Sequence, residues 1–269
     1  MTADAKVTFD MCGDIGLVTL DDRQRRNALS REIVRGLLGS LDAALAAGAR
    51  AIVIAAQGPA FCAGANIADL LDGWMEARDP DEDPALLFKR LFDFERPVIA
   101  AVHGPALGGG LELVLSCDLV VADSSAWFAM PELGHGVIPN TAVALLSRVV
   151  GMRRALELVL TRRRVDAEEA LTIGLVNRMA PVGTLQAEAL QLAQGIVEDA
   201  PPGAIRAAKS NLHGHAAVDW ARVLASPLDV PKGEWQEGLN AFAERRSPSY
   251  RRFWAAERDA YGAGARPVR

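Results

Sequence analysis

Short apolar runs alternate with longer amphipathic segments along most of the chain. The runs at 51–55, 98–102 and 119–122 contain no polar residue, which is typical of strands buried on both faces of a parallel sheet. Between residues 30 and 47 the apolar positions keep helical spacing, and Ser30 is a suitable N-cap, so a helix is predicted there. This alternation of strands and helices predicts an α/β protein.

Three other stretches of the chain follow different patterns. Residues 6–10 and 15–20 flank a Cys-Gly-Asp turn, which predicts a hairpin. The acidic stretch 72–84 contains two prolines and predicts a surface loop. From residue 183 onward the pattern is almost entirely helical, so we place a boundary near residue 200. We expect the helices beyond it to have little core of their own and to pack against neighbouring subunits.

Two glycine-rich loops, at 58–67 and 103–112, each connect a predicted strand to a predicted helix. Small residues let a ligand approach the backbone, and a helix start leaves N–H groups without partners. Such a site attracts an anion or a polarised carbonyl oxygen, and two facing each other would form an oxyanion hole. The alternative for either loop alone is that its glycines only permit a tight turn.

Both loops, in this order and beginning 45 residues apart, resemble the paired signatures of the crotonase family, the enoyl-CoA hydratase/isomerase superfamily. The resemblance covers nearly the whole chain and includes Asn27-Ala28-Leu29, Cys117 to Leu119, Met130 to Glu132, Gly136 to Pro139, Gly174 to Val176 and Glu237 through Phe242 to Pro248. It implies a crotonase-like spiral of repeated ββα units in two sheets. Residues 1–200 would form that core with the acyl-CoA site, and residues 201–269 a helical C-terminal oligomerisation region.

By position, the resemblance assigns the oxyanion hole to the backbone N–H groups of Ala65 and Gly109. It also assigns the two glutamates of the family's hydratases to Glu112 and Glu132. Hydrating a conjugated thioester needs a base for the water, an acid for the α-carbon and stabilisation of the enolate oxygen. The alternatives are that Glu112 is a first-turn acid that satisfies its own helix dipole and that Glu132 is a surface-loop acid.

Coenzyme A contacts are implied at further positions. The resemblance assigns adenine and phosphate contacts to Arg25, Ala63, Ala65 and Ile67, and contacts from a neighbouring subunit to Phe242 and Arg245. Basic clusters such as the one around Arg25 are often only solvated surface, and Phe242 could instead pack in its own core. Asn66 stands where the family usually has Asp. His135 is also unusual for the family, so the resemblance does not specify which acyl group the substrate carries.

Composition narrows the remaining possibilities. A net charge of −5 argues against a broad nucleic-acid surface, and no apolar run reaches the roughly 18 residues of a membrane helix. Three cysteines, Cys12, Cys62 and Cys117, lack metal-ligand spacing and favour a reducing, cytoplasmic compartment. No metal site is predicted. The histidines are expected to be structural, with His103 hydrogen-bonded rather than a base.

The resulting hypothesis is an enoyl-CoA hydratase that adds water reversibly and syn to a 2-enoyl-CoA, giving a 3-hydroxyacyl-CoA. The resemblance implies fatty acid metabolism such as β-oxidation, an acyl-CoA substrate, trimers or hexamers, and no metal or redox cofactor. One rival is a Δ3-Δ2 enoyl-CoA isomerase, which needs a single base. The other is a catalytically weak acyl-CoA binding protein.

Overall fold

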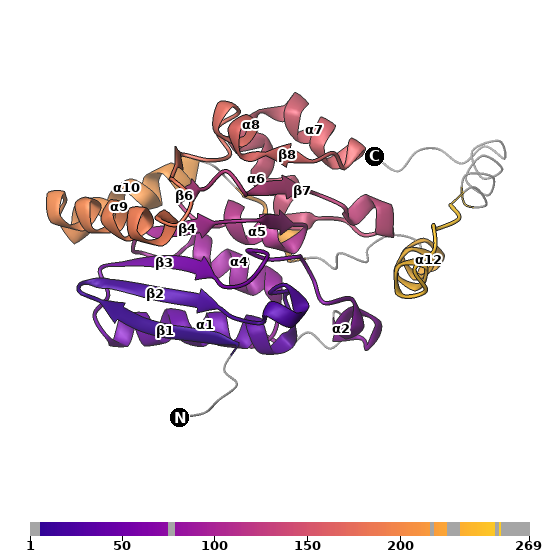
Figure 1. The fold of residues 1–269 in the computed structure, drawn as a ribbon, viewed down its shortest axis with the longest axis horizontal. Coiled ribbons are helices and arrows are strands. Elements are labelled where there is room, and N and C mark those ends of the chain that lie inside the picture. Colours follow the sequence, from indigo (N-terminus) through magenta and orange to yellow (C-terminus); the bar gives the residue numbers. More distant parts are fainter. Residues whose placement is uncertain (1–5, 75–78, 216–217, 225–231, 251–252, 254–269) are drawn as a thin grey trace.

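The computed structural model describes residues 6–74, 79–215, 218–224, 232–250 and 253. In that part of the chain the strands form two sheets (Figure 1). The larger sheet has the order β1 (Val7–Cys12), β2 (Ile15–Leu20), β3 (Ala51–Ala56), β4 (Val98–Val102), β6 (Leu119–Ala122) and β9 (Arg178–Met179). Only the β1–β2 pair is antiparallel in this sheet. The smaller sheet contains β5 (Pro105–Leu107), β7 (Trp127–Ala129) and β8 (Val165–Asp166).

Helices follow or separate most of these strands. They are η1 (Arg23–Arg25), α1 (Arg31–Ala46), α2 (Ile67–Leu71), α4 (Pro84–Phe92), α5 (Gly109–Leu115), η2 (Glu132–His135), α6 (Asn140–Val150), α7 (Met152–Thr161), α8 (Ala167–Thr172), α9 (Leu185–Asp199), α10 (Pro202–His215), α11 (Trp220–Val223) and α12 (Lys232–Ala243). No helix of the described residues combines the length and the apolar character needed to cross a membrane.

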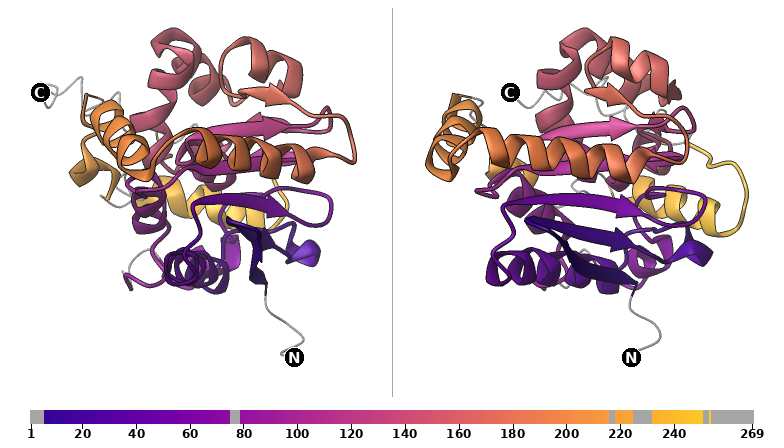
Figure 2. Two further views of the ribbon diagram at one scale, coloured as in Figure 1. Left: turned by 90° about the vertical axis from the view of Figure 1, so that its left-hand side faces the viewer. Right: turned by 60° about the vertical axis from the view of Figure 1, so that its left-hand side comes forward.

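The central strands β3 and β4 of the large sheet are buried on both faces, which explains why they are uniformly apolar. In β3, Ile52 and Ile54 belong to the main core on the side of α1 and α4. The alternating residues Val53 and Ala55 belong to a second core beneath α9, which lies across the other face of the sheet (Figure 2). Successive side chains of a strand point to opposite faces, so both sets are apolar.

The chain winds as a spiral of repeated units. A strand of the large sheet, an extended piece of the small sheet and a helix follow one another as β3, Cys62 and α2, then β4, β5 and α5, and then β6, β7 and α6. Cys62 pairs in parallel with Ala106, because Cys62 N–H donates to Pro105 O (3.1 Å) and Leu107 N–H donates to Cys62 O (3.0 Å). The two glycine-rich loops therefore lie side by side.

Most predicted elements are confirmed. The hairpin, the three buried strands and the helix after Ser30 are present, and Ser30 Oγ accepts the N–H of Ile33 (3.3 Å). The stretch 72–84 lies largely at the surface where it is described, but buried Trp74 anchors it by donating from Nε1 to Glu82 O (3.1 Å). Residues 75–78 lie outside the described residues.

The late helices α9 and α12 also pack within their own subunit, and their expected packing against neighbouring subunits stays a prediction. Leu185, Ala189 and Ala193 of α9 are buried against the large sheet. Helix α12 packs against η2 and α2 of the same chain (Figure 1). The predicted break at Pro231 and most of the last twenty residues lie outside the described residues, so the domain boundary near residue 200 stays a prediction.

Candidate active site

Ala65 presents an N–H group that has no partner among the described residues. Leu29 N–H donates to Gly64 O (2.7 Å) and Asn66 N–H donates to Leu29 O (2.7 Å), so Ala65 stands opposite Leu29 in a parallel bridge. In such a bridge the bonds run to the residues on either side of the middle one, whose own N–H faces away from the partner strand. The Ala65 N–H is therefore free to bind a ligand.

Gly109 supplies a second such group. It is the first residue of α5, where the N–H has no intrahelical partner, and no described residue accepts it. The preceding Gly108 donates to Ala129 O (2.9 Å) and has a φ of +53°. A side chain at Gly108 would also overlap Glu132 Oε1, so both backbone conformation and space require glycine there.

The two N–H groups flank the same small space. A Cβ atom placed on Gly109 would lie 3.6 Å from Ala65 N. Two convergent backbone donors in a partly enclosed site can stabilise a developing negative charge on a carbonyl oxygen. The structure thus brings together the two residues that the resemblance assigns to an oxyanion hole.

Glu112 lies in the first turn of α5 but does not serve that helix. Its Oε1 accepts the N–H groups of Thr141 (2.9 Å) and Ala142 (3.0 Å), which belong to the first turn of α6. Burial raises the pKa of Glu112 to about 7, and these two hydrogen bonds oppose that rise. The carboxyl therefore has both a fixed position and a base strength suited to neutral pH.

Glu132 opens the short turn η2, and its carboxyl faces inward rather than into solvent. Its Oε2 is buried without a hydrogen-bond partner, while Oε1 lies against Gly108. Burial, together with the negative charge of Glu112, raises the pKa of Glu132 to about 8. Because Gly108 is the N-cap of α5, the helix that carries Glu112, the two carboxyls lie in the same region of the structure.

Their different surroundings assign different protonation states to the pair near neutral pH. Glu112 accepts two N–H groups at a helix N-terminus, which favours its ionised form. Glu132 has no donor on Oε2 and faces a neighbouring negative charge, which favours its neutral form. The site therefore holds one carboxylate and one carboxylic acid beside two free N–H donors.

The residues assigned to coenzyme A form two groups. Ala63, Ala65 and Ile67 are partly exposed along one segment, and Ala63 N–H donates to Arg26 O (3.0 Å), which brings the segment next to exposed Arg25. Arg25 also pairs with Asp22 at 3.5 Å.

Phe242 and Arg245 are exposed at the end of α12. The Phe242 ring contacts His135 edge-on, with 5.2 Å between ring centroids. A contact with a neighbouring subunit's nucleotide stays a prediction.

Other conspicuous side chains have structural roles. His103 Nε2 lies 2.9 Å from Gly58 O, so it ties one glycine-rich loop to the other. Cys62 is buried, and burial raises the pKa of its thiol to about 12, so it is a packing residue. His213 stacks on Phe92 (3.9 Å between centroids). His, Cys, Asp and Glu side chains of the described residues do not gather in groups of three that could hold a metal ion.

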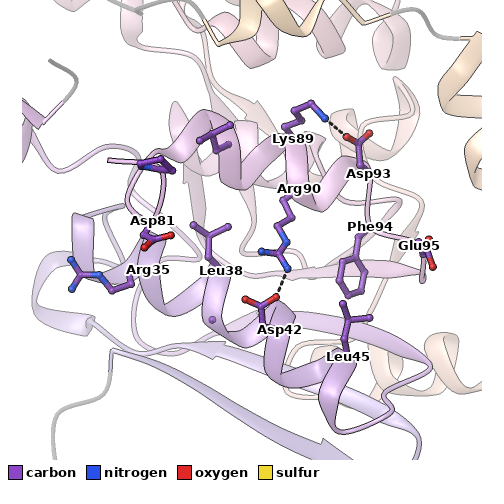
Figure 3. Close-up of a pocket in the computed structure, with 13 residues that line it drawn as sticks. Arg35, Leu38, Asp42, Leu45, Asp81, Lys89, Arg90, Asp93, Phe94 and Glu95 are labelled. Carbon is purple, nitrogen blue, oxygen red and sulfur yellow. Dashed lines mark hydrogen bonds and ion pairs between the residues drawn. The ribbon is translucent and has the colours of Figure 1, made fainter. Parts of the chain in front are cut away.

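A groove of about 800 Å³ between α1 and α4 does not compete with this site (Figure 3). Four of its charged side chains form pairs, since Arg90 reaches Asp42 across the groove and Lys89 bonds Asp93 at the end of its own helix. Neither glutamate of the candidate site lines it. The groove therefore offers an ion-paired surface without the groups that chemistry on a thioester needs.

Sequence reasoning missed the groups that hold the site in place. The N–H groups of Thr141 and Ala142 position Glu112, and backbone donors of this kind leave no signal in the side-chain pattern. Ala129 O, which accepts the Gly108 N–H, lies in a three-residue strand with no periodic signal. Asn66, which stands where the family usually has Asp, still caps α2, because its Oδ1 accepts the Ala68 N–H (3.0 Å).

Comparison with known proteins agrees with this geometry. The sequence profile of the family described as enoyl-CoA hydratase/isomerase matches residues 11–252. The mitochondrial enoyl-CoA hydratase of Pongo abelii is 34% identical over 88% of this chain and 83% of its own length. The short-chain-enoyl-CoA hydratase of Clostridium acetobutylicum is 32% identical over 89% of this chain and 95% of its own length.

A solved structure supports the same conclusion. The crystal structure of carnitinyl-CoA hydratase from Mycobacterium avium superposes with a TM-score of 0.79 at 31% identity, covering 93% of this chain and 99% of the other. The spiral of paired strands and helices is thus the fold of a known hydratase, and the chain belongs to the enoyl-CoA hydratase/isomerase family.

Proposed function

We propose that the protein is an enoyl-CoA hydratase that adds water reversibly and syn across the 2,3 double bond of a 2-enoyl-CoA. The observation that carries this proposal is the pair of inward-facing carboxyls, Glu112 and Glu132, beside the free N–H groups of Ala65 and Gly109. Hydration needs each of these groups, whereas the isomerase reaction needs only one carboxyl to move a proton.

The thioester oxygen would accept hydrogen bonds from both N–H groups. This draws electron density from the conjugated double bond and leaves carbon 3 open to attack. The negative charge that develops on the oxygen during the reaction lies between two fixed donors, which need no reorganisation at that moment.

The two carboxyls would then direct the addition of water, with the hydroxyl going to carbon 3 and the proton to carbon 2. Glu112, as carboxylate, takes a proton from water while the resulting hydroxide oxygen bonds to carbon 3 and the double-bond electrons move to the thioester oxygen. Glu132, as carboxylic acid, gives its proton to carbon 2 as the enolate collapses. The proton on Glu112 then passes to Glu132, which restores the starting state and balances the addition of one water.

The reaction changes no overall oxidation state of the thioester, so we propose that it needs no metal or redox cofactor. The substrate is supplied by a reaction that desaturates an acyl-CoA, and the product suits oxidation at its new hydroxyl group, an order that fits β-oxidation. The three cysteines have no disulfide partner, which supports the proposed cytoplasmic location.

We also propose a homo-oligomer, a trimer or hexamer. Met152, Leu156 and Leu160 are spaced four residues apart on α7 and are 63%, 50% and 63% exposed. An apolar stripe of this kind on a helix surface is typical of a protein interface. Its position differs from the C-terminal helices on which the sequence placed the contacts.

The experiment that tests the function measures loss of the conjugated enoyl-thioester absorbance with short, long, branched and aromatic 2-enoyl-CoAs. Hydration of at least one of these, with the 3-hydroxyacyl-CoA as product, supports the proposal. Turnover restricted to a 3-enoyl-CoA would indicate an isomerase instead. Tight acyl-CoA binding without any turnover would indicate a binding protein.

A further inference from the structure

Asn27 has an unusual backbone for a buried residue. It is fully buried, and its φ is +54°, directly after Arg26 with a φ of +52°. Residues other than glycine rarely adopt this left-handed conformation, although Asn tolerates it better than most. Two such residues in succession reverse the chain sharply after η1. This reversal turns the side chain of Asn27 toward the loop that leads to Ala65.

The side chain of Asn27 is fully engaged in hydrogen bonds. Its Oδ1 accepts the N–H of Asp22 (2.7 Å), and its Nδ2 donates to Gln57 O (2.8 Å) and to Ala60 O (2.8 Å). Both amide protons are thus used on carbonyl groups in the first half of the glycine-rich loop. A hydrophobic residue of the same size would leave these buried groups without partners.

The backbone around Asn27 is hydrogen-bonded to the second half of the same loop. Arg26 O accepts the Ala63 N–H (3.0 Å), and Leu29 bonds to Gly64 and Asn66 on either side of Ala65. Residues 26–29 therefore hold residues 57–66 at both ends, with the Ala65 N–H left without a partner among the described residues. Phe61 and Cys62 anchor the middle of this loop in the core, whereas residues 63–66 carry only small side chains, so the Ala65 peptide depends on backbone hydrogen bonds for its position.

We propose that Asn27 is a positioning residue for the oxyanion hole, because its side-chain amide fixes the loop that carries the Ala65 N–H. A backbone donor cannot be steered by its own side chain, so its direction depends on the bonds that hold the neighbouring peptide groups. Displacement by about 1 Å is enough to lose most of the benefit of a positioned group. This inference rests on the proposed function.

The test uses an aromatic 2-enoyl-CoA as a spectroscopic probe, because its conjugated chromophore shifts to longer wavelength when the thioester oxygen accepts strong hydrogen bonds. Asn27→Asp keeps the shape and the acceptor for Asp22 but places an oxygen opposite two carbonyl groups. Asn27→Gly suits the positive φ and removes all three side-chain bonds, so it carries the test if the Asp variant does not fold.

In both variants we expect the red shift of the bound probe to shrink and kcat to fall about 10- to 100-fold. KM should rise by a smaller factor than kcat falls, because only part of the predicted nucleotide contact, Ala63 to Ile67, lies on this loop. The matched control is Leu41→Ala, which removes a buried side chain from α1 and lowers stability without touching the loop. It should retain both the red shift and kcat.

The outcomes separate this inference from the function on which it rests. A wild-type protein that produces neither a red shift nor hydration would refute the proposed function itself. A normal wild-type shift that persists in folded Asn27→Gly, together with wild-type kcat, would overturn the role of Asn27. Equal losses in Leu41→Ala would also overturn it, because the effect would then come from lower stability alone.

Discussion

At the scale of single residues, two glutamates of the same chemical type are given different tasks by what surrounds them. Glu112 accepts two N–H groups at the start of α6, whereas Glu132 has a buried oxygen without any donor. Burial raises both pKa values. At Glu112 the two hydrogen bonds oppose this rise, whereas at Glu132 the negative charge of Glu112 adds to it. One carboxyl is therefore suited to act as a base and the other as an acid.

Replacing either carboxyl by its amide should abolish most of the hydration. For Glu112→Gln and for Glu132→Gln we expect kcat to fall by about 10²-fold or more, the scale of a lost general acid or base. Acyl-CoA binding, measured by calorimetry with a saturated analogue, should persist in both. Turnover that stays intact in Glu112→Gln but is lost in Glu132→Gln would contradict the two-carboxyl mechanism and favour isomerase chemistry.

The pH dependence of kcat should be a narrow bell. Activity falls on the acid side as Glu112 gains a proton, with a pKa of about 7, and on the alkaline side as Glu132 loses its proton, with a pKa of about 8. The two limbs belong to the interacting pair. A rate that stays flat from pH 6 to pH 9 would show that these carboxyls do not limit the reaction.

The same burial makes Glu132 a source of pH-dependent instability. Its pKa is raised on folding from 4.5 to about 8, so the folded protein binds more protons in this window and stability falls as pH rises through it. Glu132→Gln should therefore raise Tm more at pH 9 than at pH 5, by roughly 2–4 °C for each kcal/mol regained. Exposed Glu168→Gln is the control and should show no such pH-dependent gain.

At the scale of elements, the start of α5 combines a helix terminus with a catalytic donor. Gly109→Pro removes the N–H, and proline is otherwise well tolerated at the first position of a helix. We expect kcat to fall roughly 10²- to 10³-fold, the effect of losing one oxyanion donor. The thermal midpoint should change less than for a proline placed in the middle of a helix.

Two further variants at this turn define the control. Gly109→Ala keeps the N–H, but its new Cβ would meet Leu29 at 3.1 Å and lie 3.6 Å from Ala65 N, so its loss of kcat measures crowding, and the further loss in Gly109→Pro measures the missing donor. Gly108→Ala is unsuitable, because the positive φ and the overlap with Glu132 penalise any side chain. Near-normal hydration by a folded Gly109→Pro protein would place the thioester oxygen elsewhere.

The elements that could be predicted are those with a complete local signal. The apolar runs of β3 and β4 and the cap at Ser30 each specify their structure within a few residues. Strands β5, β7, β8 and β9 are two or three residues long, too short for any periodicity. They exist because successive turns of the spiral pair with each other, which is information spread along the whole chain.

The site divides in the same way. The resemblance pointed to the residues that bear chemistry, but neither the burial of Glu132 nor its contact with Gly108 could be derived from a short 3-10 turn. The packing of α12 on η2 was also hidden, because it depends on close backbone approach. A Cβ at Gly136 would lie 2.7 Å from Glu234 O, and a Cβ at Gly238 would overlap His135 O. Such approaches leave no hydrophobic pattern.

At the scale of the whole molecule, the exposed stripe on α7 bears on assembly. Leu156→Asp places a charge at its centre and should dissociate the proposed trimer or hexamer. Leu212→Asp is the matched control, since Leu212 is 71% exposed on α10 and lies outside the stripe. Light scattering at micromolar concentration should give the monomer mass for the first variant only. A monomeric wild type would refute the oligomer.

The placement of the two N–H donors on successive turns of the spiral has a kinetic consequence. Ala65 and Gly109 are 44 positions apart in sequence, and the parallel bridge between Cys62 and Ala106 keeps their loops together. Contacts of this separation form late, because the loop-closure entropy is lost before the pairing repays it. During refolding, helical circular dichroism should therefore return first. Hydratase activity should return only with the slower phase in which the strands of consecutive turns pair.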